Sequence, residues 1–273
     1  MTNYTIVASD LDGTLLDSSG KITAENLSAI SELTKKGIHF VPATGRSFVE
    51  IPDIIKSHPD IRYFIYSSGA VVYDRLTDER ISFCFPKELS SELFKMLFNT
   101  DCHLTIRHLG KMYTSKEKLN EEAFSRYKMW EPHAALLRSV SEPILGFEEK
   151  FASVDEIEMI SVFIGDDGLF NEVKARLSQI PDVNVASACP HNIELTYAKA
   201  GKGNALLALA EKLGFSQEQT IAVGDSENDI PMICAAGLGF AMSNATDETK
   251  ACADEIICSN DEHAVDFIAK RFL

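Results

Sequence analysis

Short apolar runs alternate with longer amphipathic segments at both ends of the chain. Residues 4–8, 38–43 and 220–223 are runs of this kind, and a short apolar run before a polar turn is typical of a buried parallel strand. Between the first two runs, residues 23–36 carry apolar side chains at helical spacing and are followed by Gly37, a common helix stop. Strands that alternate with helices in this way predict a parallel sheet with crossover helices.

The same alternation extends through both ends of the chain but not through its middle. Near the ends we expect strands at residues 62–66, 71–73, 80–83, 238–242 and 255–258, and helices at 48–57, 201–213 and 262–272. In the middle, candidate helices at 88–98 and 168–180 are mixed with candidate strands at 103–107, 111–114, 157–164 and 183–187. We therefore predict an α/β core made of residues 1–83 and 190–273, with an α+β domain, residues 84–189, inserted between its halves.

Composition and charge exclude several classes of function. The 273 residues suffice for two modest domains. The formal net charge of -15 argues against a general nucleic-acid binder and against a protein held on anionic membrane, whereas a small phosphorylated ligand needs only a few local cations or a metal. The first residues lack a secretion signal, no apolar run approaches ~20 residues, and no cysteine has zinc-ligand spacing. We expect a cytoplasmic protein without membrane or nucleic-acid partners.

Two carboxylates stand directly after the first predicted strand, in the segment Asp10-Leu11-Asp12-Gly13-Thr14. Side chains two positions apart on a strand point the same way, and ligands of open parallel sheets bind at the carboxyl ends of the strands. Paired carboxylates suit Mg²⁺, and one could attack phosphorus while the other moves the proton of the ester or of water. The same pattern occurs in turns and in calcium loops, but a calcium loop needs a glutamate where this chain has Lys21.

Three further segments follow predicted strands or open a predicted helix. Thr44-Gly45-Arg46 offers a hydroxyl and backbone N–H groups to a phosphate, although such a segment is more often a turn, and such an arginine more often pairs with a surface carboxylate. Lys202 opens a helix, where an anion is favoured, or is simply a solvated lysine; the spacing of a Walker loop is missing. Asp225 and Asp229 could hold a metal, orient Lys202 or cap a helix.

In order along the chain, these four segments resemble the motifs of the haloacid dehalogenase superfamily, and in particular its Cof-type phosphatases of subfamily IIB. The matching segments are Asp10-Leu11-Asp12-Gly13-Thr14-Leu15-Leu16, Thr44-Gly45-Arg46, Lys202-Gly203-x-Ala205-Leu206 and Gly224-Asp225-Ser226-x-Asn228-Asp229-Ile230-x-Met232, and the similarity continues through residues 237–245. The resemblance implies a Rossmann-like parallel-sheet core with helices on both faces, and an inserted α+β cap domain of the C2 type.

The resemblance also implies roles for individual residues. Asp10 would be the nucleophile and Asp12 the general acid/base. Mg²⁺ would be held by Asp10, the backbone carbonyl of Asp12 and Asp225, with support from Asp229. The residues that would bind phosphate or substrate are Leu11, Thr44, Gly45, Arg46, Lys202 and Asn228. Related transport ATPases carry a threonine in place of Asp12, so a carboxylate here favours hydrolysis of an aspartyl-phosphate over its storage.

We therefore expect Mg²⁺-dependent hydrolysis of a small phosphorylated metabolite, such as a sugar phosphate, by a monomer or homodimer. Phosphoryl transfer to another sugar hydroxyl, as in mutase relatives, and phospholigand binding without turnover are the alternatives. Two segments depart from the family pattern. Ser68-Gly69-Ala70 stands where relatives often have Asn-Gly-Ala, and Asn260-Asp261-Glu262-His263-Ala264-Val265 where they often have Asn-Asp-x-Asp-Gly-Val. Both lie outside the four motifs, so they bear on substrate choice rather than on the chemistry.

Overall fold

The computed structural model describes residues 4–272, which divide into two compact units. Within these residues, the first unit comprises the chain up to Arg46, Ile51–Ile81 and the chain from Ala200 onward; we call it the core. The second unit comprises Ser47–Glu50 and Ser82–Lys199, and we call it the cap. Residues 1–3, which contribute to the expectation that the chain has no secretion signal, lie outside the described residues.

The core contains a five-stranded parallel sheet with the strand order β14-β13-β12-β1-β2. Its strands are β1 (Ile6–Ser9), β2 (His39–Pro42), β12 (Thr220–Gly224), β13 (Leu238–Ala241) and β14 (Glu255–Ile256). β1 and β12 come from opposite ends of the chain and pair in register, with Ile6 opposite Thr220 and Ser9 opposite Val223. The first apolar run of the sequence therefore forms an inner strand of the sheet, β1, between β12 and β2.

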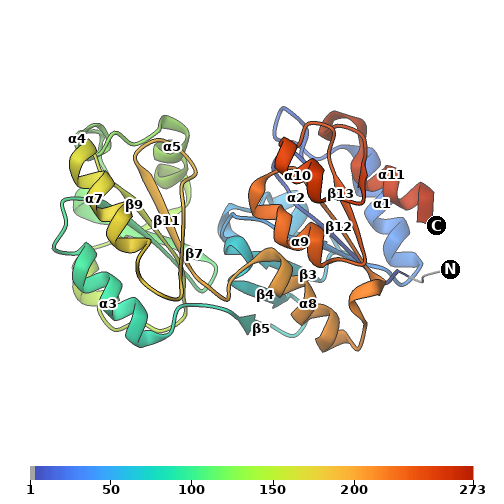
Figure 1. Ribbon diagram of the computed structural model, residues 1–273, viewed down its shortest axis with the longest axis horizontal. Helices are drawn as coiled ribbons and strands as arrows, with labels where there is room; N and C mark the ends of the chain where they lie inside the picture. The colour runs from blue at the N-terminus through green and yellow to red at the C-terminus, as the bar shows by residue number, and fades with distance from the viewer. Residues whose placement is uncertain (1–3, 273) are drawn as a thin grey trace. The chain divides into compact units, whose positions relative to one another are not determined.

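Helices cover both faces of this sheet, which is why its strands are almost wholly apolar. α1 (Ala24–Lys35) packs against α11 (Ala264–Phe272), and α8 (Lys202–Leu213) packs against α9 (Ile230–Ala235). Figure 1 shows the two pairs on opposite sides of the sheet, with the blue amino-terminal and the orange to red carboxy-terminal elements interleaved. The predicted α/β core is confirmed. Among the described residues, no helix combines the length and apolar content that crossing a bilayer requires.

One helix expected in the core is wrong. Residues 48–57 form a single 3₁₀ turn, η1 (Phe48–Glu50), and a separate short helix, α2 (Asp53–Lys56). Pro52 divides them, because proline has no N–H to donate and disfavours helical backbone at the residue before it. After α2, the strands β3 (Tyr63–Tyr66), β4 (Val71–Asp74) and β5 (Glu79–Ser82) form a small sheet in that order.

The cap contains a six-stranded sheet with the strand order β10-β11-β9-β6-β7-β8. Its strands are β6 (His103–His108), β7 (Lys111–Ser115), β8 (Ser141–Ile144), β9 (Ile157–Phe163), β10 (Val183–Ala186) and β11 (Asn192–Tyr197). All neighbours are antiparallel except β7 and β8. The expected limit of the inserted domain at residue 189 would assign β11 to the core, but β11 pairs with β9 and β10 because Ile193 and Leu195 belong to the hydrophobic interior of the cap.

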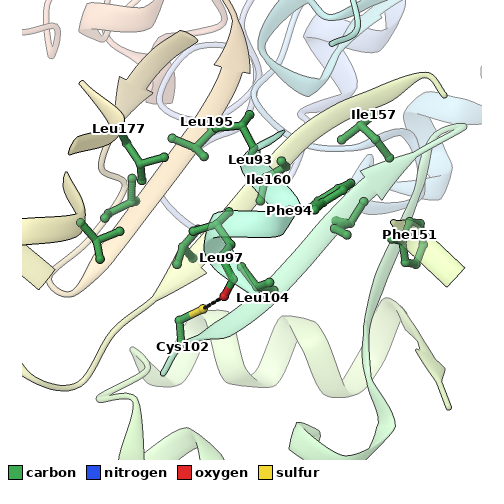
Figure 2. Close-up of a cluster of buried hydrophobic side chains, with 14 of the residues drawn as sticks. Leu93, Phe94, Leu97, Cys102, Leu104, Phe151, Ile157, Ile160, Leu177 and Leu195 are labelled. Carbon is green, nitrogen blue, oxygen red and sulfur yellow. Dashed lines mark hydrogen bonds between the residues drawn. The ribbon is translucent and has the colours of Figure 1, made fainter. Parts of the chain in front are cut away.

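One face of the cap sheet packs against α3 (Lys87–Leu97), α6 (Phe147–Phe151) and α7 (Asp167–Leu177). Figure 2 shows how Leu93, Phe94 and Leu97 of α3 lie against side chains of the strands, including Leu104 and Ile160. All of these are fully or nearly fully buried. Burial of a leucine or phenylalanine contributes roughly 1.5–3 kcal/mol each, so this layer is the main source of stability within the cap.

The opposite face of the cap sheet mixes polar side chains with apolar ones such as Met112 and Phe163. Thr105 of β6, Ser161 of β9 and Glu194 of β11 stand in one row across it. Arg107 pairs with Glu50, with 3.2 Å between Nε and Oε2, and this buried ion pair attaches the segment Ser47–Glu50 to the cap. Two helices that the sequence pattern does not indicate, α4 (Glu121–Arg126) and α5 (Glu131–Val140), lie on this side of the sheet.

His103 on this face of the sheet makes the stability of the cap depend on pH. The ring is fully buried beside Phe124 and Tyr127, and burial, together with the charges of Lys118 and His133, lowers its pKa to about 3 from an ordinary value of 6.5. As the pH falls below 6.5, His103 binds a proton in the unfolded chain but stays neutral in the folded cap. We expect the free energy of unfolding to fall by about 2 kcal/mol between pH 6.5 and about pH 5 from this residue alone.

Urea denaturation followed by circular dichroism at a series of pH values measures this effect. The variant His103→Gln should lose that part of the pH dependence. Thr114→Val is the matched control, because it removes the hydroxyl 3.5 Å from the ring nitrogen of His103 and leaves the ring in place. It should lower stability without changing the slope against pH. A wild-type slope in His103→Gln would contradict the assignment.

Candidate active site

Three of the predicted segments meet at one edge of the core sheet. β1, β2 and β12 are adjacent and parallel, so their carboxyl ends meet at the same edge. Asp10 follows β1 directly, and its backbone N–H donates to the carbonyl of Val223 on β12 at 3.0 Å. On the other side, the N–H of Ala43 donates to the carbonyl of Ser9 at 2.8 Å. The side chain of Asp10 is almost completely buried.

Lys202, the first residue of α8, reaches this edge and joins two carboxylates. Its Nζ lies 2.5 Å from Oδ1 of Asp10 and 2.6 Å from Oδ1 of Asp229. The lysine is only 1% exposed, so water cannot replace these partners. Burial by itself lowers the pKa of Lys202, but the two carboxylates outweigh it and hold the pKa above its ordinary value. The ammonium group is therefore permanently charged at physiological pH.

Three carboxylates gather around this lysine. Asp10, Asp225 and Asp229 each have an oxygen within 4.8 Å of the others. Burial and the charge of Asp229 raise the pKa of Asp10 well above its ordinary value, against the lowering effect of Lys202. Burial and the charge of Asp229 also raise the pKa of Asp225, to about 6. The mutual repulsion of these groups is what a bound cation would offset.

Asp229 differs from the other two carboxylates because both of its oxygens already accept hydrogen bonds from protein groups. Oδ1 accepts from Lys202, and Oδ2 accepts from the backbone N–H groups of Asp225 and Ser226 at 3.0 and 3.1 Å. It thus shapes the loop that follows β12. The hydroxyl of Thr14 donates to Oδ1 of Asp225 at 3.1 Å.

Thr14 and Asn244 are residues of this site to which the sequence pattern assigned no role. Asn244 donates from Nδ2 to the carbonyl of Gly13 at 2.8 Å. Gly13 has φ +78, and a Cβ there would lie 2.5 Å from Oδ2 of Asp225, so only glycine fits between the two loops. Thr14 and Asn244 both lie in segments that match the family, and that match was the only signal for them.

Thr44-Gly45-Arg46 forms a tight loop after β2. Thr44 is buried, and its hydroxyl accepts from the N–H of Arg46 at 3.1 Å. A Cβ on Gly45 would lie 3.4 Å from Oγ of Ser68 and 3.8 Å from Nδ2 of Asn228, so these two side chains flank the loop. Arg46 itself pairs with Asp12 through two contacts, Nε to Oδ2 at 2.8 Å and Nη2 to Oδ1 at 2.6 Å.

Ser67, Ser68 and Gly69 follow β3 with positive φ values of 49, 54 and 84. Ser68 is not a glycine, and serine tolerates this left-handed backbone less well than asparagine or glycine does, so the loop is strained at Ser68. The N–H groups of Ser67 and Ser68 donate to the carbonyls of Arg46 and Thr44 at 2.7 and 3.0 Å, which holds the strained segment against the loop after β2.

The predicted site residues lie together, but the side chain of Leu11 points away from the site. The side chain of Leu11 is completely buried in the hydrophobic interior, so only its backbone could contact a ligand. Asn228 lies on the loop after β12, and its Oδ1 accepts from the hydroxyl of Ser226 at 2.8 Å. The remaining predicted residues, Asp10, Asp12, Thr44, Gly45, Arg46, Lys202, Asp225 and Asp229, form one cluster at the carboxyl edge of the sheet.

Known proteins resemble the chain over almost its whole length. The family model of haloacid dehalogenase-like hydrolases matches residues 7–268. Phosphatase YwpJ of Bacillus subtilis is 31% identical, over 98% of this chain and 99% of its own length. The 5-amino-6-(5-phospho-D-ribitylamino)uracil phosphatase YcsE of the same organism is also 31% identical, over 95% of this chain and 92% of its own length.

A solved haloacid dehalogenase-like hydrolase from B. subtilis has a similar fold, with a TM-score of 0.78 and 30% identity. The similarity covers 98% of this chain and 100% of that one. The family match spans both units, and it includes all four segments in which the resemblance was seen. The chain therefore belongs to the haloacid dehalogenase-like hydrolases, as its motifs predicted.

Proposed function

We propose that this protein hydrolyses phosphate monoesters of small metabolites, with Mg²⁺, through a phosphorylated intermediate on Asp10. One observation carries the proposal: the buried carboxylate of Asp10 contacts a permanently charged lysine, at a strand edge where two more carboxylates gather. The family supports it, and so do the relatives named phosphatases. A nucleophile held next to a cation is what attack on a phosphate dianion requires, because like charges would otherwise repel.

In the first step, an oxygen of Asp10 bonds to phosphorus and the bond from phosphorus to the ester oxygen breaks. The electron pair leaves with the ester oxygen, which takes a proton from Asp12 acting as general acid. Lys202 offsets the negative charge shared by Asp10 and the phosphoryl group. Thr44, Gly45 and Asn228, with the backbone of Leu11, would contact the phosphoryl oxygens.

In the second step, Asp12, now a carboxylate, takes a proton from water. The oxygen of that water bonds to phosphorus, and the bond from Asp10 to phosphorus breaks. Inorganic phosphate leaves, and both aspartates return to their starting state. The side chain of Asp12 is 58% exposed, so both water and the leaving group can approach it.

The residues present fit a hard divalent cation. Mg²⁺ prefers oxygen ligands, and the close carboxylates with raised pKa values would bind a cation to relieve their repulsion. Asp10, the backbone carbonyl of Asp12 and Asp225 would hold the ion, while Asp229 would support them through the loop after β12. A bound Mg²⁺ supplies charge neutralisation of the phosphoryl group.

The name of one relative supports a proposal for the substrate class. One curated relative is named for a phosphorylated ribitylamino-uracil, so we propose a sugar or polyol phosphate of similar size for this chain. A panel of such esters, assayed by phosphate release, should give at least one ester with a kcat/KM well above that of p-nitrophenyl phosphate. Transfer of the phosphoryl group to a second sugar in place of water would identify a mutase instead.

The variant Asp10→Asn tests the nucleophile. With p-nitrophenyl phosphate and Mg²⁺, we expect kcat to fall by roughly 10⁴-fold or more, as it does when other covalent enzymes lose their nucleophile. Removal of the metal with EDTA should abolish activity, and added Mg²⁺ should restore it. Hydroxylamine trapping followed by mass spectrometry should place the acyl phosphate on Asp10.

Asp53→Asn is the matched control, because Asp53 lies on the core surface with its side chain 97% exposed. It should retain full activity. Turnover that survives both EDTA and Asp10→Asn would rule out the mechanism. Tight binding of phosphorylated ligands with no turnover by the wild-type protein would favour a regulator in place of an enzyme.

The variant Gly13→Ala tests the metal site. The new Cβ would lie 2.5 Å from Oδ2 of Asp225, so that carboxylate must turn away. We expect the Mg²⁺ concentration that gives half-maximal activity to rise by roughly 10- to 100-fold. Gly20→Ala is the matched control, because Gly20 has a similar φ of +75 but nothing within 4 Å of the added Cβ.

Each of the two variants should lose about 1 kcal/mol of stability from the left-handed backbone. Gly20→Ala should keep the wild-type requirement for Mg²⁺. Titrating activity against Mg²⁺ and measuring thermal unfolding separates the two effects. An unchanged Mg²⁺ requirement in Gly13→Ala would argue that Asp225 is not a ligand.

A further inference from the structure

The guanidinium group of Arg46 holds the carboxylate of Asp12 at two points. Nε lies 2.8 Å from Oδ2, and Nη2 lies 2.6 Å from Oδ1. Such a fork fixes the plane of the carboxylate as well as its distance, whereas a lysine in the same place would act as a point charge. The ion pair also joins the loops that follow β1 and β2.

Both partners reach this contact from anchored backbone. The N–H of Arg46 donates to Thr44, and its carbonyl accepts from the N–H of Ser67 at 2.7 Å. On the other side, Asn244 holds the carbonyl of Gly13, the residue after Asp12. The side chain of Asp12 is 58% exposed, and an aspartate that exposed would otherwise sample several rotamers. The fork restrains a side chain that solvent would leave mobile.

We propose that Arg46 is a positioning residue that orients Asp12 for its two proton transfers, and that this role outweighs any contact of Arg46 with phosphate. The inference rests on the proposed function, since those transfers occur only if the chain hydrolyses phosphate esters. The fork occupies one lone pair on each oxygen of Asp12 and leaves the others to the ester oxygen and to water. Lys202, buried between Asp10 and Asp229, already supplies the cation for the nucleophile.

The leaving group separates positioning of Asp12 from binding of phosphate. Dinitrophenolate leaves without a proton, so the first step with dinitrophenyl phosphate does not need Asp12. An alkyl ester such as glycerol phosphate needs that proton. The second step, hydrolysis of the phosphorylated Asp10, needs Asp12 with either ester. If Asp12 is poorly positioned, the first step with the aryl ester should therefore keep its rate. The first step with an alkyl ester and the second step with either ester should slow.

The variant Arg46→Lys keeps the positive charge and loses the fork. In stopped-flow measurements with dinitrophenyl phosphate, we expect the burst rate to stay within about threefold of wild type, while steady-state turnover falls by roughly 10- to 100-fold. Turnover of glycerol phosphate should fall by a similar factor. In the Asp12→Asn background, Arg46→Lys should cause no further loss of turnover, because it acts through Asp12.

Arg62→Lys is the matched control. Arg62 forms an equivalent fork to Asp74 in the core, with contacts of 3.0 and 2.7 Å, so its replacement reports any general loss of stability. It should change neither burst nor turnover. If Arg46→Lys slows burst and turnover equally, or if its effect multiplies with that of Asp12→Asn, Arg46 acts on phosphate and the inference is overturned. Absence of a phosphorylated Asp10 in the wild-type enzyme would overturn the proposed function itself.

Discussion

The contact of Lys202 with Asp10 and Asp229 is the interaction on which the rest of the site depends. A lysine 1% exposed must be paired, because an unpaired buried charge costs several kcal/mol. Its partners follow different strands, and Asp10 is separated from Lys202 by 192 positions in the sequence. The pairing of one ammonium group thus joins residues from both ends of the chain at one edge of the sheet. Loss of Lys202 would leave two buried carboxylates without their cation.

The same pairing leaves an excess of negative charge. One lysine faces three carboxylates whose oxygens lie within 4.8 Å of one another, and burial raises the pKa values of Asp10 and Asp225. Asp229 is satisfied by Lys202 and by backbone N–H groups, so the unmet charge lies on the other two. Such an excess of buried negative charge lowers the stability of the fold. A bound divalent cation would neutralise it and would also attract a phosphate.

The core was predictable from sequence because its signals are local. Each apolar run is followed by its own polar loop, so the strand ends could be identified one at a time, and parallel pairing then required them to meet. The cap was less predictable because its elements depend on distant contacts. α4 and α5 are short, and Phe124 of α4 and Leu137 of α5 pack against Met112 on strand β7. β11 was assigned to the wrong side of the expected boundary because its place depends on pairing with β9, which sequence periodicity does not reveal.

Within the site, the residue types were predictable but their ionic partners were not. Arg46 and Asp12 follow adjacent strands, which predicts only that they are near each other. The pairing of cations with carboxylates follows their burial. Lys202 is buried and pairs with the buried Asp10 and Asp229, whereas Arg46 is 31% exposed and pairs with the exposed Asp12. This division suits the chemistry. A nucleophile gains from a cation in a dry environment, and a group that exchanges protons with water needs a partner that restrains it without burying it.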